Sequence, residues 1–331
     1  MPALSPDNFS TPLLAWFAVA QRDMPWRRTR DPYAIWISEV MLQQTQVATV
    51  RDYWLRFMAR FPTVRDLADA PQDAVLKLWE GLGYYRRARH LQAAAGEIVA
   101  RHDGQLPADP AALRMLPGFG PYTAGAVAAI AFDLPEPAVD GNVLRVLARL
   151  AAWEDDVTLP ATRRKAEALA SALIPAGRAG DFAQALMELG ALICTPRKPR
   201  CGECPVAGAC RARQAGIAES LPRKAPRAKA PYADMLVAVV VAGDRVLVER
   251  RPERGMLGGL MAFPAVRLAG GEAHAAAIAR AAAAAGVTAE PGNALVAYPF
   301  AFTHLRTTHH AYLAAWRGGE PAGQARWESV A

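Results

Sequence analysis

The four cysteines of the chain lie close together and could hold a metal centre. They follow the spacing Cys-x6-Cys-x2-Cys-x5-Cys, as Cys194, Cys201, Cys204 and Cys210. In a cytosolic protein such clustering indicates metal ligation more often than disulfides. Four thiolates suit a structural zinc ion or an iron-sulfur cluster. Zinc sites usually pair two Cys-x2-Cys knuckles, and only one knuckle is present here, so the spacing favours one [4Fe-4S] cluster.

A glycine-containing turn ahead of an apolar segment could bind phosphate. In LPGFGPYTAGAVAAIAF, Gly118 and Gly120 allow a sharp turn, and the free amides at the following helix start attract an anion. An ordinary interhelical turn is the alternative, because two glycines before a helix are a weak signal. Between the first two cysteines, Arg197, Lys198 and Arg200 could also contact a phosphate backbone.

Positive charge is concentrated around and after the cysteines. Between Cys194 and Pro231, nine basic side chains stand against Glu203 and Glu219, a balance of +7 that equals the formal net charge of the 331-residue chain. A local excess of this kind is typical of a surface that neutralises nucleic-acid phosphates. For the part after Glu219, a solvated linker is an equally good interpretation.

Helical patterns separated by Pro and Gly occupy residues from about 12 to 212. Residues 35–61 have helical spacing with no breaker before Pro62, which predicts one helical segment. Residues 73–102 repeat the pattern, but Gly81 and Gly83 interrupt it and predict a helix-loop-helix joint. We expect a helical region at 1–212 and a basic, Pro-rich linker at 213–231.

After the linker, the pattern changes to that of a smaller α/β domain at 232–331. MLVAVVVAG, a Gly243-Asp244 turn and RVLVERR predict a hairpin, and an Ala-rich helix should stop at Gly286. The longest apolar runs, 124–132 and 235–243, are too short to span a bilayer. The N-terminus lacks the features of a secretory signal, so we expect a cytoplasmic protein with no membrane partner.

Several long motifs give the chain a specific resemblance. WISEVMLQQTQV, GLGYYRRARHL, LPGFGPYTAGA, VDGNVLRVLARL and the cysteine run occur in the order and spacing of the MutY family, the adenine-specific branch of the endonuclease III superfamily. The match extends from about Trp16 to Cys210. It implies a mainly α helix-hairpin-helix glycosylase fold, with a six-helix part at about 25–135 flanked by a part at about 136–212 that packs with the N-terminus and carries the [4Fe-4S] loop. In bacteria, such a protein would act at the nucleoid.

The resemblance also implies two catalytic carboxyl groups. Glu39 would protonate the leaving adenine, Asp140 would face the sugar cation, and Asn142 would orient Asp140 or the water. Glu39 has apolar neighbours that could raise its pKa by burial, whereas amide donors at a helix start would keep Asp140 ionised. Taken as isolated residues, a surface glutamate and a helix-capping aspartate are the ordinary alternatives.

Further roles follow from the same resemblance. Gln44 and Tyr84 would insert into the duplex, with Thr45 in the same group, while Arg27 and Gln184 would line the adenine pocket. Tyr84 and Tyr85 could otherwise be core aromatics. Tyr122 occupies the place of the lysine nucleophile of endonuclease III-type enzymes and cannot form a Schiff base, which implies a monofunctional glycosylase.

The region 232–331 resembles the α+β, Nudix-like domain with which the family recognises 8-oxoguanine, through Phe302, Thr303 and His304. The helix AIARAAAAAG lacks the acidic ligands of Nudix hydrolases, so we expect a recognition domain. The family usually continues beyond the position of Trp327, so this domain is expected to be either clipped or unusually short. His304 alone could be an ordinary strand residue. The expected partner is double-stranded DNA with A:8-oxoguanine or A:G mispairs, bound by a monomer. The alternatives are a bifunctional glycosylase/lyase and a non-catalytic iron-sulfur damage sensor.

Overall fold

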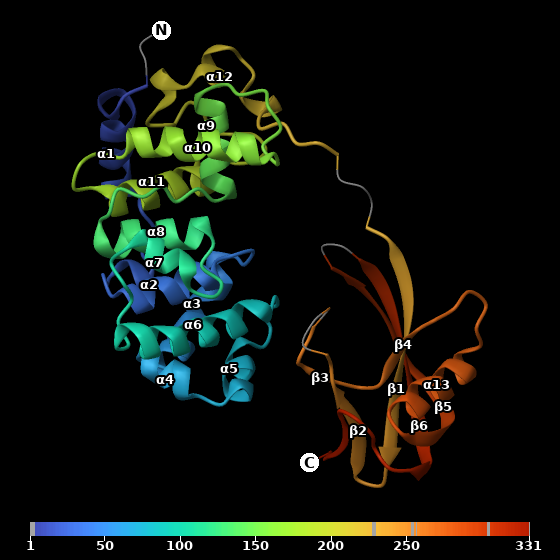
Figure 1. Cartoon of the computed structure of the whole chain (residues 1–331). Coiled ribbons are helices and arrows are strands. Elements are labelled where there is room, and N and C mark those ends of the chain that lie inside the picture. Colours follow the sequence, from blue (N-terminus) through green and yellow to red (C-terminus); the bar gives the residue numbers. More distant parts are fainter. Residues whose placement is uncertain (1–3, 227–229, 253–254, 256, 303–304, 331) are drawn as a thin grey trace. The chain divides into compact units, whose positions relative to one another are not determined.

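The chain forms two compact units, Met1–Ala225 and Pro226–Ala331 (Figure 1). The computed structural model describes residues 4–226, 230–252, 255, 257–302 and 305–330. Each unit has its own core, so each is described by itself. Among these residues, no helix has the length and apolar character that crossing a membrane requires.

Helices build the first unit, as the sequence predicts. Its elements are η1 (Pro6–Ser10), α1 (Thr11–Ala20), η2 (Pro25–Arg27), α2 (Pro32–Met41), α3 (Val47–Arg60), α4 (Val64–Asp69), α5 (Gln72–Trp79), α6 (Arg86–His102), α7 (Pro110–Met115), α8 (Pro121–Phe132), α9 (Gly141–Leu150), α10 (Pro160–Leu173), α11 (Ala179–Leu192), η3 (Ala207–Ala209), α12 (Arg211–Gln214) and η4 (Ala218–Ser220).

The prediction of one helical segment over 35–61 is wrong. α2 ends at Met41 and α3 begins at Val47, so the turn at residues 42–46 separates them. Gln44 in this turn has a φ of 59°, in the left-handed region that a glutamine rarely adopts. No Pro or Gly marks the break. The cause is tertiary, because carbonyl groups at the end of α2 accept hydrogen bonds from the side chain of Arg87 on α6.

The predicted joint at Gly81 and Gly83 is confirmed. α5 ends at Trp79, α6 begins at Arg86, and the two glycines have φ values of 95° and 71°. A Cβ at Gly81 would meet the hydroxyl oxygen of Tyr53, so a side chain here would have to displace that tyrosine. These glycines therefore form a tight loop at residues 80–85.

One apolar core of the first unit joins the N-terminus to the region around the cysteines. Phe9, Leu13 and Phe17 pack with buried side chains of α9, α10 and α11, and the half-buried Cys194, Cys204 and Cys210 lie against this core. The structure differs from the expected linker at 213–231, because Ala218 and Leu221 are buried against Ala212. Residues 213–225 thus pack on the first unit.

In its described residues, the second unit consists of a seven-stranded sheet with one helix against it. Its elements are β1 (Tyr232–Ala242), β2 (Arg245–Arg250), β3 (Met261–Ala262), β4 (Ala265–Arg267), α13 (His274–Ala284), β5 (Val287–Ala301), β6 (Arg306–Gly319) and β7 (Ala325–Ser329). The main strand order is β3-β2-β1-β6-β5, with β4 on β1 and β7 on β2. The predicted hairpin is confirmed by the β1–β2 pairing of Val241 with Val246, and the predicted helix ends before Gly286.

Candidate active site

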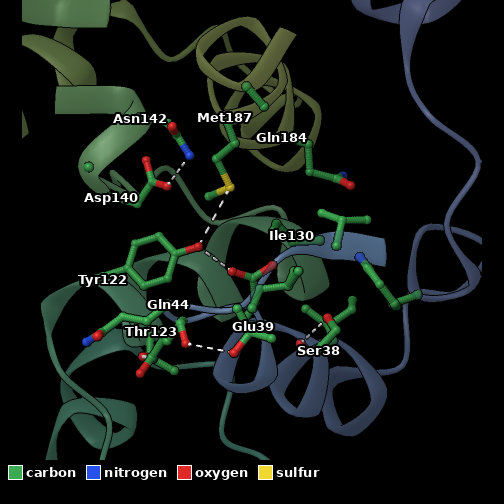
Figure 2. A pocket seen from close by; sticks show the side chains of 18 of the residues that line it. Ser38, Glu39, Gln44, Tyr122, Thr123, Ile130, Asp140, Asn142, Gln184 and Met187 are labelled. Atoms are coloured by element: carbon green, nitrogen blue, oxygen red, sulfur yellow. Dashed lines mark hydrogen bonds between the residues drawn. The ribbon is translucent and has the colours of Figure 1, made fainter. Parts of the chain in front are cut away.

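A cavity of about 670 Å³ in the first unit is lined by α2, α8, α9, α11 and the turns next to them. Figure 2 shows the Glu39 and Tyr122 side chains pointing toward each other, with Asp140 and Asn142 nearby. The cavity brings together ten of the residues that the sequence selected. They are Arg27, Glu39, Gln44, Thr45, Gly118, Gly120, Tyr122, Asp140, Asn142 and Gln184.

Glu39 projects into this cavity from α2, a helix whose residues are buried from Tyr33 to Met41. Its side chain is 5% exposed, and Oε2 accepts a hydrogen bond of 2.5 Å from the Tyr122 hydroxyl. Burial raises the pKa of Glu39 to about 7, and the Asp140 carboxylate adds to this rise, while Tyr122 and Arg27 oppose it. A large fraction of Glu39 is therefore protonated at neutral pH.

Asp140 is the N-cap residue of α9, as the sequence suggests. Its Oδ1 accepts from the backbone amide of Val143 at 2.7 Å, and its Oδ2 accepts from Nδ2 of Asn142 at 3.0 Å. Burial raises the pKa of Asp140 above its usual value, although these donors and the Arg145 charge lower it. The predicted donors are present, but their effect on the pKa is smaller than the effect of desolvation.

Asn142 is itself held from the opposite side. Its Oδ1 accepts from Nη2 of Arg145 at 2.8 Å, and Nε of Arg145 donates to the carbonyl oxygen of Cys194 at 2.7 Å. A Cβ on Gly190 would lie 2.7 Å from Cβ of Asn142, so this glycine permits the close approach of α11 to α9. Sequence reasoning missed Arg145. It could have been found as a basic residue among the apolar residues of α9.

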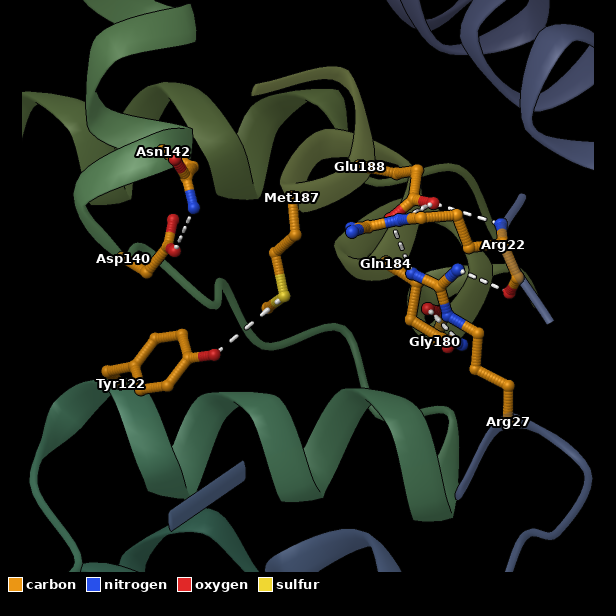
Figure 3. A network of polar contacts seen from close by, with 9 residues as sticks. All are labelled: Arg22, Arg27, Tyr122, Asp140, Asn142, Gly180, Gln184, Met187 and Glu188. Carbon is orange, nitrogen blue, oxygen red and sulfur yellow. Dashed lines mark hydrogen bonds and ion pairs between the residues drawn. The ribbon is translucent and has the colours of Figure 1, made fainter. Parts of the chain in front are cut away.

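A second buried carboxylate, Glu188, lines the same cavity and was not foreseen. It is 1% exposed and accepts hydrogen bonds from Arg22 Nε at 2.8 Å and from Arg27 Nη2 at 2.9 Å (Figure 3). Desolvation is the largest single effect on Glu188 and would raise its pKa. The hydrogen bonds from the two arginines together outweigh desolvation and lower the pKa to about 2. A single acidic residue on the apolar face of α11, four residues after Gln184, was the available signal.

The four cysteines line a separate small cavity beside α9 and η3. Nη1 of Arg149 lies 3.3 Å from Sγ of Cys194 and donates to the carbonyl oxygen of Thr195 at 2.7 Å, so a buried cation lies beside one of the four sulfurs. Four cysteine side chains around one cavity supply the thiolate ligands that a [4Fe-4S] cluster needs, and Cys194, Cys201, Cys204 and Cys210 would hold it.

Family models match three parts of the chain. Residues 37–175 match the HhH-GPD superfamily of base excision DNA repair proteins, residues 194–210 match the iron-sulfur binding domain of endonuclease III, and residues 236–331 match the NUDIX domain.

Relatives cover most of the chain. The adenine DNA glycosylase of Rattus norvegicus is 38% identical over an alignment of 380 positions. The alignment covers 96% of this chain and 73% of the rat protein. The adenine DNA glycosylase of Mus musculus is 41% identical, over 80% of this chain and 62% of the mouse protein. The chain belongs to the adenine DNA glycosylase family. It is thus a base excision repair glycosylase, a hydrolase of N-glycosyl bonds, and the expected [4Fe-4S] cluster is confirmed.

Solved structures agree with the match of the first unit to the HhH-GPD superfamily. A thermostable thymine-DNA glycosylase is 31% identical with a TM-score of 0.58, over 63% of this chain and 97% of that one. An endonuclease III bound non-covalently to DNA is 25% identical with a TM-score of 0.54, over 65% of this chain and 99% of that one. The predicted helix-hairpin-helix fold and the C-terminal Nudix domain are confirmed, and the family acts on DNA.

In this glycosylase, Gln44 and Tyr84 lie on two different loops. Gln44 lies in the 42–46 turn, next to Thr45, and Tyr84 in the 80–85 loop. Tyr84 is 49% exposed, so it is not a core aromatic, whereas Tyr85 is half-buried. Both Gln44 and Tyr84 have left-handed backbones, with φ values of 59° and 48°.

The expected phosphate-binding residues lie on two segments. Gly118 has a φ of 78°, and Gly120 is the N-cap residue of α8, whose first residue is Pro121. In the cysteine loop, the side chains of Arg197, Lys198 and Arg200 are exposed. Arg200 also pairs with Glu203 at 2.9 Å, so part of its charge is already compensated.

Of the residues expected to recognise 8-oxoguanine, the structure describes one. Phe302 lies just beyond β5 and packs on Phe300, with ring centroids 4.5 Å apart. Thr303 and His304 lie outside the described residues.

Proposed function

We propose that this glycosylase removes adenine mispaired with 8-oxoguanine or guanine from duplex DNA and leaves the strand uncut. The observation that carries the proposal is the pairing of Glu39, with a pKa of about 7, and Asp140 in one cavity. The name shared by the rat and mouse relatives supports adenine as the excised base.

The two carboxyl groups divide the chemistry of the reaction. Breaking the N-glycosidic bond leaves electrons on adenine and positive charge on the sugar. Glu39 donates a proton to N7 of adenine, which makes the base a better leaving group. Asp140 stabilises the cation at C1′ or captures it transiently before water attacks. Asn142 orients Asp140 through its 3.0 Å hydrogen bond.

Tyr122 supports a hydrolytic outcome without strand cleavage. Its hydroxyl donates to Glu39, and burial raises its pKa well above the usual value, so it stays protonated. A phenol also has no amine group with which to form a Schiff base. No lysine is found among the described residues that line the cavity. A lyase reaction through a Schiff base would therefore need an amine from elsewhere.

DNA recognition is assigned to both units. Gln44, Thr45 and Tyr84 would open the duplex, Arg27 and Gln184 would line the pocket for the extrahelical adenine, and Gly118, Gly120, Arg197, Lys198 and Arg200 would contact phosphates. The second unit, with Phe302, Thr303 and His304, would inspect the base opposite adenine. We propose that the protein does this as a monomer.

The test is an assay of base release with the cluster-loaded full chain. Duplexes carrying adenine opposite 8-oxoguanine, adenine opposite guanine, or thymine glycol are incubated with enzyme, and free base and strand breaks are measured before and after alkali. We expect adenine release from the first two duplexes, with breaks only after alkali. Breaks without alkali would favour a lyase, and the absence of base release would favour a binding protein.

The catalytic assignment is tested with Asp140→Asn. The change keeps the shape of the side chain but removes the charge that faces the sugar, so we expect adenine release to fall by about 10²-fold or more. Glu97→Gln is the matched control, because Glu97 is a half-buried residue of α6 that pairs with Arg101 and does not line the cavity, and it should release adenine at the parental rate. Parental activity of Asp140→Asn would contradict the assignment.

A further inference from the structure

Arg87 joins the two loops that carry Gln44 and Tyr84. It lies in the first turn of α6, and its guanidinium group reaches both the 42–46 turn with the end of α2 and the 80–85 loop. Nη1 donates to the carbonyl oxygens of Val40, Met41 and Gln43 at 2.7, 2.9 and 2.6 Å. Nη2 lies 3.3 Å from each of its acceptors, which are Thr45 Oγ1 and the carbonyl oxygens of Leu82 and Gly83.

The position of Arg87 is unfavourable for its own helix. A cation in the first turn of a helix faces the positive end of the helix dipole. Burial lowers the pKa of Arg87 to about 10, and its Nε atom is buried with no hydrogen-bond partner in the described part of the chain. The favourable hydrogen bonds of Arg87 are made with the carbonyl end of α2 and with the two loops. Arg87 therefore stabilises these loops and not its own helix.

Both loops need such support, because each holds a strained backbone. Gln44 and Tyr84 have φ values of 59° and 48°, and such conformations persist where surrounding contacts impose them. The Arg87 acceptors include the carbonyl groups directly before these residues, those of Gln43 and Gly83. The guanidinium group also lies over the Tyr84 ring, 5.6 Å from its centroid.

We propose that Arg87 is a positioning residue that fixes the 42–46 turn and the 80–85 loop to each other, so that Gln44 and Tyr84 enter the duplex as one rigid wedge. This inference rests on the proposed function, in which these two residues open the DNA. A planar guanidinium group with five donors suits this task, whereas a lysine ammonium offers three donors at one point. Arg87 therefore acts on the opening of the duplex and not on the cleavage of the bond.

The experiment separates these two steps. Arg87→Met and Arg87→Lys are made in a Glu39→Gln background, in which we expect base release to be slow enough for binding and unstacking to be followed separately. A duplex with 2-aminopurine next to the target adenine reports unstacking by a rise in fluorescence, and anisotropy of a labelled duplex reports binding. We expect Arg87→Met to slow unstacking at least tenfold, with a smaller change in binding, and Arg87→Lys to fall between it and the Arg87 protein.

Controls keep the outcome interpretable. Arg101→Met removes an exposed arginine at the far end of the same helix and should unstack DNA at the parental rate. Cluster absorbance and thermal melting show whether each variant is folded, and if Arg87→Met is not, the folded Arg87→Lys protein decides the question. Unstacking at the parental rate in a folded Arg87 variant would overturn the proposal. Failure of the unmodified enzyme to release adenine would instead overturn the proposed function.

Discussion

Glu39 and Glu188 line the same cavity and are almost fully buried, at 5% and 1% exposure, but their pKa values move in opposite directions. Burial raises the pKa of Glu39 to about 7, and among the described residues only the Tyr122 hydroxyl donates a side-chain hydrogen bond that opposes this rise. Glu188 loses water as well, yet Arg22 and Arg27 supply four hydrogen bonds and two positive charges, and its pKa falls to about 2. The donors, and not burial, distinguish the two groups.

This difference assigns different tasks to two residues of one type. At neutral pH Glu39 can give up a proton, whereas Glu188 is a permanent anion that holds two arginines in place.

The consequences of the two pKa shifts for the pH dependence of stability also differ in sign. The contribution of Glu39 is full below pH 4.5 and is lost as pH rises to about 7. The contribution of Glu188 is present above pH 4.5 and is lost as pH falls toward 2.

The largest expected effect comes from Glu39→Gln. Loss of the acid should slow adenine release by about 10²–10⁴-fold in single-turnover assays. The same change removes the cost of ionising a buried carboxyl group, so the free energy of unfolding at pH 8 should rise by up to about 3 kcal/mol, with little gain at pH 4.5. Denaturant melts at the two pH values measure this. Equal effects at both would show that the pKa of Glu39 is not raised.

Glu188→Gln tests the other end of the cavity. Arg27, which is nearly buried, and Arg22, which is partly exposed, would both lose their partner, so we expect a loss of about 2–4 kcal/mol in the free energy of unfolding. The uncompensated charge of Arg27 would also lower the pKa of Glu39. Activity requires protonated Glu39, so the basic limb of the pH–rate profile should move to lower pH by about half a unit to one unit. Glu97→Gln is the control for stability. If the basic limb does not move in Glu188→Gln, the charges around Glu188 do not affect the pKa of Glu39.

The resemblance to the MutY family selected the two catalytic carboxyl groups, because Glu39 and Asp140 taken as isolated residues have ordinary structural interpretations. Local patterns predicted only their surroundings. The Gly141-Asn142 sequence and the apolar periodicity after it favour a helix start at Asp140, and Glu39 has apolar neighbours in Trp36, Ile37, Val40 and Met41. Glu188 was missed because its arginine partners are 161 and 166 residues away in the chain. The break at 42–46 was missed for the same reason, since Arg87 supplies its hydrogen bonds from a separate helix. Charged groups that satisfy distant carbonyls or carboxylates leave no periodic signal.

Tyr122→Phe should have the smallest effect and the opposite direction. The hydroxyl stabilises ionised Glu39, so its removal should raise the pKa of Glu39 and move the basic limb to higher pH, with less than about a fivefold change in rate at pH 7. If Tyr122 and Glu188 both act on the proton of Glu39, their opposite effects should cancel. The basic limb of the Tyr122→Phe, Glu188→Gln double variant should then return close to that of the parent. A double variant that keeps the shift of either single change would mean that only that group affects the pKa of Glu39.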